Sequence, residues 1–413
     1  MISVGKEANL VEQVKYPSPY RWVVFALAAV AFFLVNYNWN IVATLLDLIP
    51  DLGLSETEFG LLFTAPTLAG ILVSIPGGML ADRYGIRRIL GIAVVLTTVG
   101  CLLRVTATGF ESMFAYNFLM GIGLGILFAL QPKLVGLWFP PRQVGLATGL
   151  YMMAMGVGMA LGLATGPMYP TWQSAFLFPG IAVAVITVLW IVLGRDRPAG
   201  VSAAETELVG FREGMGRALR SRNMWFVNTA QFMVGVIILA YIGSLPYLLT
   251  EFKGMVEESA SLISALAVVG FTIGTIFWPV LSEVVGIRNP IFMMTMVLTG
   301  ITGMLVWFLA PGAGMWALAF FPGFFIAAAL TFMMMAPIEL PEIGPRYAGN
   351  ATGILSTTYN LGAFVGLPYM MLPIAAVSAN WAFIFLLIVC VVTGALALGI
   401  REIGRKAREK QAE

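Results

Sequence analysis

Long apolar runs alternate along the chain with short segments that are polar or rich in Gly and Pro. A helix that crosses the hydrocarbon core of a bilayer, which is ~30 Å thick, needs about 20 mostly apolar residues. Six runs of that length precede a polar stretch at 195–222, and six more follow it. The pattern therefore predicts an all-α integral membrane protein. We expect twelve transmembrane helices, at 21–46, 57–80, 89–108, 112–134, 144–168, 173–194, 224–250, 258–284, 290–310, 314–338, 347–373 and 379–400.

The composition supports this prediction and leaves little room for structure outside the bilayer. Of the 413 residues, 59% are hydrophobic and 11% are charged, whereas soluble domains carry about 25% charged residues. The remaining parts are an N-terminal segment at 1–20, a linker at 195–222 and a tail at 401–413. Because the N-terminal segment is polar and the first apolar run is too long for a signal-peptide core, we expect no cleaved targeting peptide.

Several classes of enzyme are excluded by residues that the sequence lacks. There is no His, which removes HExxH zinc sites, His-based triads and His proton relays. Cys101 and Cys390 lie far apart in apolar runs and indicate neither a disulfide framework nor a CxxC site. No GxSxG or GxxxxGK[ST] motif occurs, so neither a hydrolase nor an ATPase is indicated. We expect no enzymatic activity, no bound metal and no cofactor.

The basic residues lie almost entirely on one side of the expected helices. With twelve spans and both termini on one side, that side carries 21 of the 23 Lys and Arg residues, and only Arg104 and Lys253 fall toward the other. Lys and Arg are enriched in the cytoplasmic loops of membrane proteins. We therefore expect a multi-pass protein of the cytoplasmic (inner) membrane with both termini in the cytoplasm.

An internal repeat is visible in two pairs of similar tracts. The tract 78–88 follows the second span, and 279–288 follows the eighth span, 201 positions later. The tract 141–149 recurs at 345–353, at an offset of 204. Nearly equal offsets predict two six-helix halves of the same orientation. The expected halves are 21–194 and 223–400.

The first of these tracts carries a resemblance that extends over essentially the whole chain. Residues 78–88 read Gly-Met-Leu-Ala-Asp-Arg-Tyr-Gly-Ile-Arg-Arg, which is similar to the loop signature between helices two and three of the major facilitator superfamily. The resemblance implies a secondary transporter, a symporter or antiporter, in which two bundles rock about a site at the membrane midplane. It also implies that spans 1, 4, 7 and 10 line the cavity and that spans 3, 6, 9 and 12 lie outside. The tract from Pro132 to Gly149 resembles the branches that carry organic anions, nitrate or cyanate.

Charged residues at the cytoplasmic ends of the spans are candidates for a gate. Asp82 can accept hydrogen bonds at the start of a neighbouring helix and pair with Arg83 or Arg87. The alternative is a simple topology anchor of cytoplasmic arginines. Lys133 and Glu339 follow corresponding prolines in spans 4 and 10, and we expect them to pair across the two halves and close the cytoplasmic gate. The candidate gating residues are Gly78, Asp82, Arg83, Gly85, Arg87, Arg88, Lys133, Glu283, Arg288 and Glu339.

Polar side chains inside the expected cavity helices are candidates for substrate contact, because a polar group buried in a membrane needs a partner. Asn36 and Asn40 lie one turn apart on span 1, and Asn117 and Gln131 lie on one stripe of span 4. Each of them is also compatible with a hydrogen bond between helices. The candidate substrate-binding residues are Asn36, Tyr37, Trp39, Asn40, Asn117, Gln131, Gln231, Tyr241, Tyr359 and Asn360.

Arg104 is a charged residue well inside an expected span. It lies roughly 22 Å along span 3, at 1.5 Å per residue. From there its side chain can snorkel outward to the membrane surface or point at a carboxylate. Because the resemblance places span 3 on the periphery, we expect it to snorkel.

Small residues and methionines in the spans each have two interpretations. Gly158, Gly162 and Gly166 lie on one face of span 5, and we favour close helix packing over a signature of antiport. The methionines at 152–159 and 333–335 suit an adaptable binding wall. We expect them instead to face lipid or to pack between helices.

Together these features predict a secondary transporter of a small organic solute, and we expect a metabolite anion such as a carboxylate. The alternative is an exporter or carrier of amphipathic or quaternary-ammonium cations, because Tyr37 and Trp39 offer cation–π faces. No Asp or Glu lies deep in spans 1, 4 or 7, so a coupling mechanism would depend on carboxylates at the edges of the spans, and facilitated diffusion or exchange stays open. The expected partners are the solute, a coupling proton or ion, and the lipid bilayer; we expect a monomer and no nucleic acid.

Overall fold

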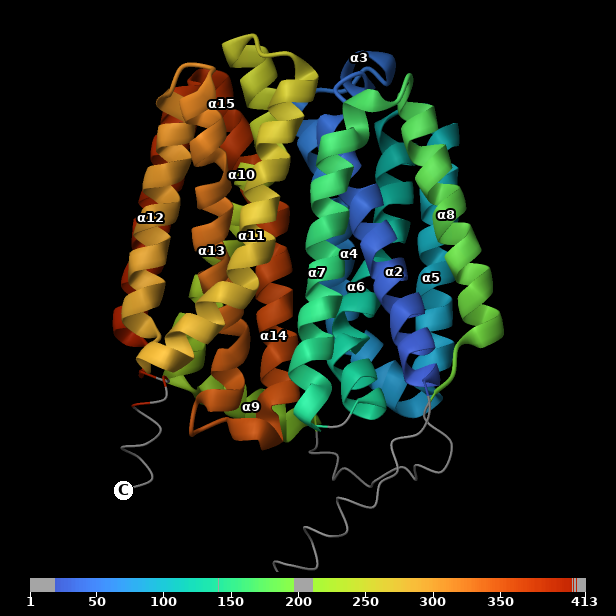
Figure 1. The fold of residues 1–413 in the computed structure, drawn as a ribbon, viewed down its shortest axis with the longest axis vertical. Coiled ribbons are helices and arrows are strands. Elements are labelled where there is room, and N and C mark those ends of the chain that lie inside the picture. The colour runs from blue at the N-terminus through green and yellow to red at the C-terminus, as the bar shows by residue number, and fades with distance from the viewer. Residues whose placement is uncertain (1–18, 140, 197–210, 403, 405, 407–413) are drawn as a thin grey trace, which may run out of the picture.

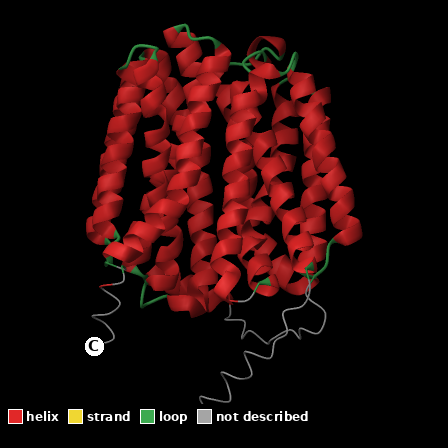
Figure 2. Ribbon diagram, viewed as in Figure 1, coloured by secondary structure: helices red, strands yellow, loops and turns green. Residues whose placement is uncertain are grey.

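The structure is a computed structural model that describes residues 19–139, 141–196, 211–402, 404 and 406. Within these residues the regular structure is helical throughout (Figure 2). Twelve helices in this part of the chain are long and apolar enough to cross a membrane, which confirms the expected number. Their ends agree with the expected ends to within about one helical turn.

The chain forms two halves of six spans each. The spans of the N-terminal half are α2 (Tyr20–Asn40), α4 (Glu56–Tyr84), α5 (Ile86–Leu103), α6 (Phe110–Trp138), α7 (Pro141–Thr165) and α8 (Trp172–Leu193). The spans of the C-terminal half are α10 (Arg222–Lys253), α11 (Glu257–Val285), α12 (Asn289–Phe308), α13 (Ala313–Glu339), α14 (Gly344–Val365) continued by a π-helix (Gly366–Met371) and α15 (Leu372–Val377), and α16 (Ala379–Leu396). Among the described residues, two short helices lie outside the spans, α3 (Leu48–Asp51) and α9 (Phe211–Arg220).

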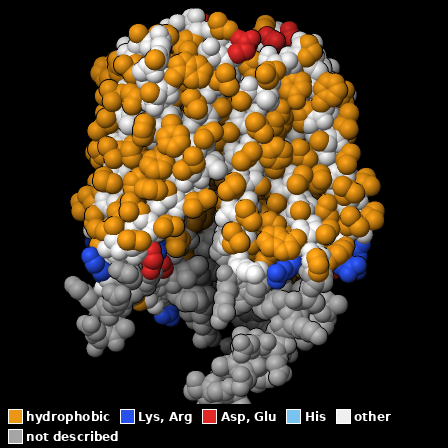
Figure 3. All heavy atoms as spheres, in the orientation of Figure 1, with side chains coloured by type: hydrophobic (Ala, Val, Ile, Leu, Met, Phe, Trp, Pro, Cys, Tyr) orange, Lys and Arg blue, Asp and Glu red, His pale blue; other side chains and the backbone are white. Residues whose placement is uncertain are grey.

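The two halves stand side by side with their helices roughly parallel (Figure 1). α9 and the C-terminus lie at one end of the bundle, and α3 and α15 lie at the other (Figure 1). We call the first end, where Gly85 and Gly286 join consecutive spans, the basic end, and the second the distal end. Lys and Arg side chains show on the surface of the basic end, with a few acidic ones beside them, and Asp and Glu side chains show on that of the distal end (Figure 3). The Lys and Arg side chains agree with the charge asymmetry of the sequence.

Burial separates central spans from peripheral ones. In α10, 89% of the residues in its most apolar stretch are buried, compared with 33% in α8. The halves meet where α4 packs against α14 and α7 packs against α11. At the second contact a Cβ added to Gly156 would lie only 1.9 Å from Oγ1 of Thr272, so the absence of a side chain at Gly156 permits this close approach.

The start of α4 shows how local sequence sets a helix end. The Ser55 hydroxyl accepts a hydrogen bond from the backbone N–H of Glu58 at 3.3 Å, and the backbone N–H of Ser55 donates to the Glu58 carboxylate at 2.8 Å. This reciprocal arrangement satisfies N–H groups that have no partner inside the helix. The second span therefore begins where its capping residues place it.

The helix α9, between the two halves in sequence, is attached to the C-terminal half. Glu342, just after α13, accepts hydrogen bonds from the Ser221 hydroxyl at 2.9 Å and from Nδ2 of Asn223 at 2.7 Å. Arg217 on α9 donates to the backbone carbonyl of Glu342 at 2.7 Å. Partial burial alone would raise the pKa of the Glu342 carboxyl, but the bonds from Asn223 and Ser221 hold that pKa below its usual range.

The lowered pKa of Glu342 predicts a pH-dependent contribution to stability. A group whose pKa is lower in the folded state stabilises the fold above its unfolded pKa and loses that contribution as the pH falls through the folded value. Glu342→Gln should therefore lower the unfolding temperature at pH 7 and flatten its dependence on pH below about 4, the ordinary Glu range. Thermal unfolding in detergent at several pH values tests this. Equal acid sensitivity of the wild type and the variant would contradict it.

Candidate functional site

A cavity of about 80 Å³ lies between the two halves. Its wall is built from α2, α4, α6 and α7 of the N-terminal half and from α10, α11, α13 and α14 of the C-terminal half. The surface is hollowed along the same boundary toward the basic end (Figure 3). The lining residues are Phe32, Asn36, Trp39, Asn40, Ser74, Leu124, Gly125, Phe128, Met155, Met159, Ile238, Leu239, Ile242, Phe271, Leu330, Met334, Tyr359 and Asn360.

Three asparagine amides are among the polar groups that line this cavity. Nδ2 of Asn36 donates to the carbonyl of Phe32 at 2.8 Å, and Nδ2 of Asn40 donates to the carbonyl of Asn36 at 3.0 Å. Nδ2 of Asn360, from the other half, donates to the carbonyl of Ser356 at 2.8 Å. A side-chain amide has two N–H donors and one carbonyl acceptor. Each amide therefore has one N–H and one side-chain carbonyl oxygen that form no hydrogen bond among the described residues.

The rest of the wall is aromatic, aliphatic or thioether. Nε1 of Trp39 donates to the Phe63 carbonyl at 2.7 Å, which fixes the indole at the edge of the cavity. Among the described lining residues there is no Lys, Arg, Asp or Glu. The polar character of the wall therefore comes from neutral groups, chiefly amides, hydroxyls and the indole N–H.

Half of the candidate substrate-binding residues come together here, and the other half lie elsewhere. Asn36, Trp39, Asn40, Tyr359 and Asn360 line the cavity, whereas Tyr37, Asn117, Gln131, Gln231 and Tyr241 are not among its lining residues.

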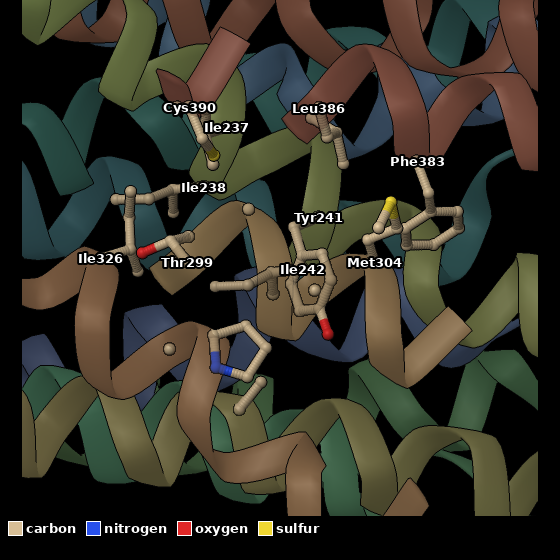
Figure 4. Close-up of a pocket in the computed structure, with 15 residues that line it drawn as sticks. Ile237, Ile238, Tyr241, Ile242, Thr299, Met304, Ile326, Phe383, Leu386 and Cys390 are labelled. Carbon is tan, nitrogen blue, oxygen red and sulfur yellow. The ribbon is translucent and has the colours of Figure 1, made fainter. Parts of the chain in front are cut away.

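Four of the five residues outside the cavity have a described neighbour within their own half, and the fifth, Gln231, has a buried side-chain amide with no hydrogen-bond partner among the described residues. The Tyr37 hydroxyl bonds to the hydroxyls of Thr165 and Tyr169, and Gln131 donates to Oγ1 of Thr148 at 3.3 Å. Tyr241 borders a separate, smaller cavity of about 20 Å³ inside the C-terminal half, beside Met304 and Phe383 (Figure 4). Gln231 is fully buried, and Asn117 contacts Arg104.

The expectation that Arg104 snorkels is wrong. Its side chain is completely buried, and NH1 and NH2 donate to the backbone and side-chain oxygens of Asn38 at 2.8 and 2.7 Å. The guanidinium also donates to Oδ1 of Asn117 at 3.3 Å and lies over the ring of Phe176. Span 3 ends beside spans 1, 4 and 6, so the arginine points into the half instead of toward the membrane surface.

The expectation for the methionines is wrong at three positions. Met155, Met159 and Met334 line the cavity, while Met153 is exposed. Ser74, Phe128 and Phe271 also line the cavity and carried no signal in the sequence, since a single hydroxyl or ring in an apolar span is compatible with ordinary packing.

At the basic end the two halves repeat one arrangement. Gly85 and Gly286 both have a positive φ, +88° and +85°, in the region that only glycine adopts without strain. After Gly85, the backbone N–H of Arg87 donates to Asp196 at 2.8 Å. The two glycines differ in ψ, 155° at Gly85 and 12° at Gly286, so the internal repeat of the sequence is present in the positive φ and in the contact that follows it, not in the whole turn.

The C-terminal half uses Glu402 where the N-terminal half uses Asp196. The Glu402 carboxylate accepts the backbone N–H groups of Arg288 and Asn289 at 2.8 and 3.0 Å. In each half, a carboxylate just after the sixth span of that half accepts hydrogen bonds from free backbone N–H groups at the start of its third span. The start of a helix also favours a negative charge because of the helix dipole. Sequence reasoning missed both residues. The matching Gly194-Arg195-Asp196 and Gly399-Ile400-Arg401-Glu402 tracts were the available signal.

The other candidate gating residues surround these turns. Arg288 is ion-paired with Glu339, and with Glu283 at 3.3 Å. Arg87 donates to the Ile191 carbonyl at 3.0 Å, and Arg83 lies over the ring of Tyr84. Arg88 is exposed and Lys133 is half-buried near the end of α6. The surroundings of Gly78 and the side chain of Asp82 lie outside the described part of the structure.

A largely apolar cavity with a few amide groups, walled by both halves of a twelve-span helical bundle, is the arrangement expected of a membrane transport protein. The sequence model described as Major Facilitator Superfamily matches residues 27–367, and the chain belongs to this superfamily. It is therefore a multi-pass membrane transporter of small molecules and not an enzyme.

Curated relatives and solved structures agree with this assignment. The chain is 24% identical over 374 residues to the probable sulfoacetate transporter SauU of Cupriavidus necator, covering 84% of this chain and 85% of that protein. It is 28% identical over 234 residues to the hexuronate transporter of Bacillus subtilis, covering 54% of each. The fold is similar to a bacterial homologue of the human lysosomal transporter Spinster in an inward-facing, unoccupied conformation. That similarity has a TM-score of 0.70 at 15% identity and covers 93% of this chain and 97% of that structure.

Proposed function

We propose that this protein moves a small organic anion, a carboxylate or a sulfonate, across the cytoplasmic membrane by alternating access. The cavity between the halves is the substrate site, and the basic end faces the cytoplasm. The observation that carries the proposal is that Asn36, Asn40 and Asn360 bring free amide groups from both halves to one cavity. A solute bound by both halves would be exposed to either side as they rock.

The lining of the cavity favours an anion over a cation. Amide N–H groups donate well to carboxylate and sulfonate oxygens, and no carboxylate lies among the described lining residues to neutralise a cation. The named substrates of the two relatives, sulfoacetate and hexuronate, are organic anions. The aromatic faces of Trp39 and Tyr359 keep a quaternary-ammonium cation as the second candidate.

In this proposal each half moves as one body, and the contacts at the basic end form the gate. Asp196 and Glu402 attach the ends of the sixth and twelfth spans to the starts of the third and ninth. Glu339, ion-paired with Arg288 in the structure, exchanges this partner for Lys133 of the other half when the cytoplasmic gate closes. Unchanged transport after Lys133→Glu would contradict the exchange. Coupling to a proton is tested by measuring the rate of transport with and without a pH gradient, and a rate that depends on the gradient indicates a coupled proton.

A ligand screen with cavity variants tests the proposal. Purified protein is heated in detergent with sulfoacetate, glucuronate, nitrate or tetraphenylphosphonium, because a ligand at 100 times its Kd stabilises by about 2.7 kcal/mol. We expect sulfoacetate or glucuronate to stabilise, and Asn36→Ala and Asn360→Ala each to weaken that ligand about tenfold, since a bond to a charged group contributes roughly 1.5 kcal/mol or more.

A matched control separates lost binding from general damage. Asn380 at the distal end accepts a bond from Nε1 of Trp307 at 2.7 Å and is not among the cavity residues. Asn380→Ala should lower the unfolding temperature and leave the affinity unchanged. Stabilisation by tetraphenylphosphonium alone would overturn the anion proposal in favour of the cation carrier. Uptake of the stabilising anion into proteoliposomes completes the test.

A further inference from the structure

Arg104 is a buried cation whose described hydrogen-bond partners are all neutral. It donates to the two oxygens of Asn38 and to Oδ1 of Asn117, and its guanidinium carbon lies 4.1 Å from the centre of the Phe176 ring. In the part of the chain that the structure describes, no carboxylate pairs with it, and its Nε has no hydrogen-bond partner. The side chain is 0% exposed.

Burying the unpaired charge of Arg104 destabilises the fold, so a function that requires the charge would explain why it is present. A charge buried in a low-dielectric protein interior without an ionic partner is strongly destabilising, although Arg104 lies only two residues before the end of its span. A purely structural role is the alternative, because Arg104 bonds a carbonyl near the end of α2, where backbone acceptors lack partners. A neutral amide donor would satisfy that carbonyl without burying a charge, so the structural role does not explain the arginine.

The charge lies directly behind the cavity wall. Asn36 and Asn40 on α2 line the cavity, while Asn38, two residues from each, bonds to Arg104. Residues two apart point to opposite sides of a helix. One helix, about 10 Å across, therefore separates the guanidinium from the cavity. At an effective dielectric constant of about 20, a unit charge at that distance changes the affinity for a monovalent ion about tenfold.

We propose that Arg104 is the charge that makes the cavity electropositive and selects anions, acting through α2 without touching the solute. Its neutral partners Asn38 and Asn117 hold the guanidinium in place and leave its charge uncompensated. The part of this inference that concerns anion selection rests on the proposed function, whereas the potential in the cavity can be measured without any substrate.

The potential is measured with a cysteine placed in the cavity. In Asn36→Cys protein, the rates of modification by anionic ethylsulfonate and cationic ethyltrimethylammonium methanethiosulfonate are compared, and the parent protein, whose cysteines are both buried, gives the background. Arg104→Gln should lower the anion-to-cation rate ratio about a hundredfold, roughly tenfold for each reagent. Arg104→Lys, which retains the positive charge, should leave the anion-to-cation rate ratio unchanged.

Asn38→Asp removes the net charge while leaving Arg104 in place. A carboxylate at this position pairs with the guanidinium and preserves the geometry, so the variant should fold at least as stably as the wild type and still lose the rate ratio. Because the new carboxylate lowers the potential by its own charge, Asn38→Asp tests the reach of the field from this position, and a purely structural role for Arg104 is excluded by a loss in Arg104→Gln that Arg104→Lys does not show. Ser74→Cys is the distance control. Ser74 lies 18 residues from the distal start of α4, about 27 Å from the end of the bundle at which Arg104 lies. At this cysteine, loss of the charge should change the anion-to-cation rate ratio less than tenfold.

The outcomes for potential and for binding are distinguishable. Sulfoacetate affinity should fall at least tenfold in Asn38→Asp if both proposals hold. If no anion stabilises the wild type but the rate ratio falls, the proposed function fails and the role of Arg104 in the potential stands. If sulfoacetate binds and neither Arg104→Gln nor Asn38→Asp changes the ratio or the affinity, the inference is overturned and the proposed function survives.

Discussion

Glu339→Gln should destabilise the C-terminal half by about 3–5 kcal/mol, the cost of removing one partner from a buried ion pair. The Arg288 side chain is only 2% exposed and that of Glu339 only 10%, so the substitution leaves a cation buried beside the ring of Phe332. The remaining carboxylate, Glu283, is 47% exposed and is screened by solvent. Thermal unfolding in detergent measures the loss.

Two further variants identify the cause of that loss. Glu283→Gln removes the exposed partner and should cost less than about 1 kcal/mol. The double variant Arg288→Met, Glu339→Leu removes both charges at similar volume and should recover most of the stability, as replacement of buried ion pairs by apolar residues often does. If Glu283→Gln costs as much as Glu339→Gln, the Arg288–Glu339 pair is not the dominant interaction.

The spans and the repeat could be predicted from the sequence because both are local properties. Apolar length alone identifies a span, and the Ser55 capping box marks the start of α4. Matching tracts around Gly85 and Gly286 identify the two halves, and the two glycines have nearly the same φ. None of these features depends on how one helix packs against another.

The candidate site was only half predictable because helical spacing does not give the rotation of a helix about its axis. Asn36, Asn38 and Asn40 belong to one polar stretch of α2, yet two of them face the cavity and Asn38 faces Arg104. Asn117 was expected in the cavity and instead contacts Arg104. The peripheral position of span 3 predicts that Arg104 faces the membrane, but the distal end of this span packs against the rest of its half and buries the arginine.

Gly158→Ala should destabilise the N-terminal half by roughly 1–3 kcal/mol, the usual cost of overpacking, and reduce transport in proteoliposomes. A Cβ at Gly158 would lie 2.3 Å from the carbonyl oxygen of Phe33, and one at Gly162 would lie 2.6 Å from that of Tyr37. These are backbone atoms of α2, so relief requires α2 and α7 to move apart. Thermal unfolding of the Ala variants measures the effect.

The same helix offers a matched control. A Cβ at Gly149 would meet nothing within 4 Å, and Ala is favoured over Gly in a helix by about 1 kcal/mol, so Gly149→Ala should be neutral or stabilising. Equal losses at Gly149 and Gly158 would show that α7 needs glycine for flexibility and not for contact. Because Gly158 and Gly162 pack against a helix of their own half, loss at Gly158 alone supports close helix packing, with α2 held against α7 as the halves rock.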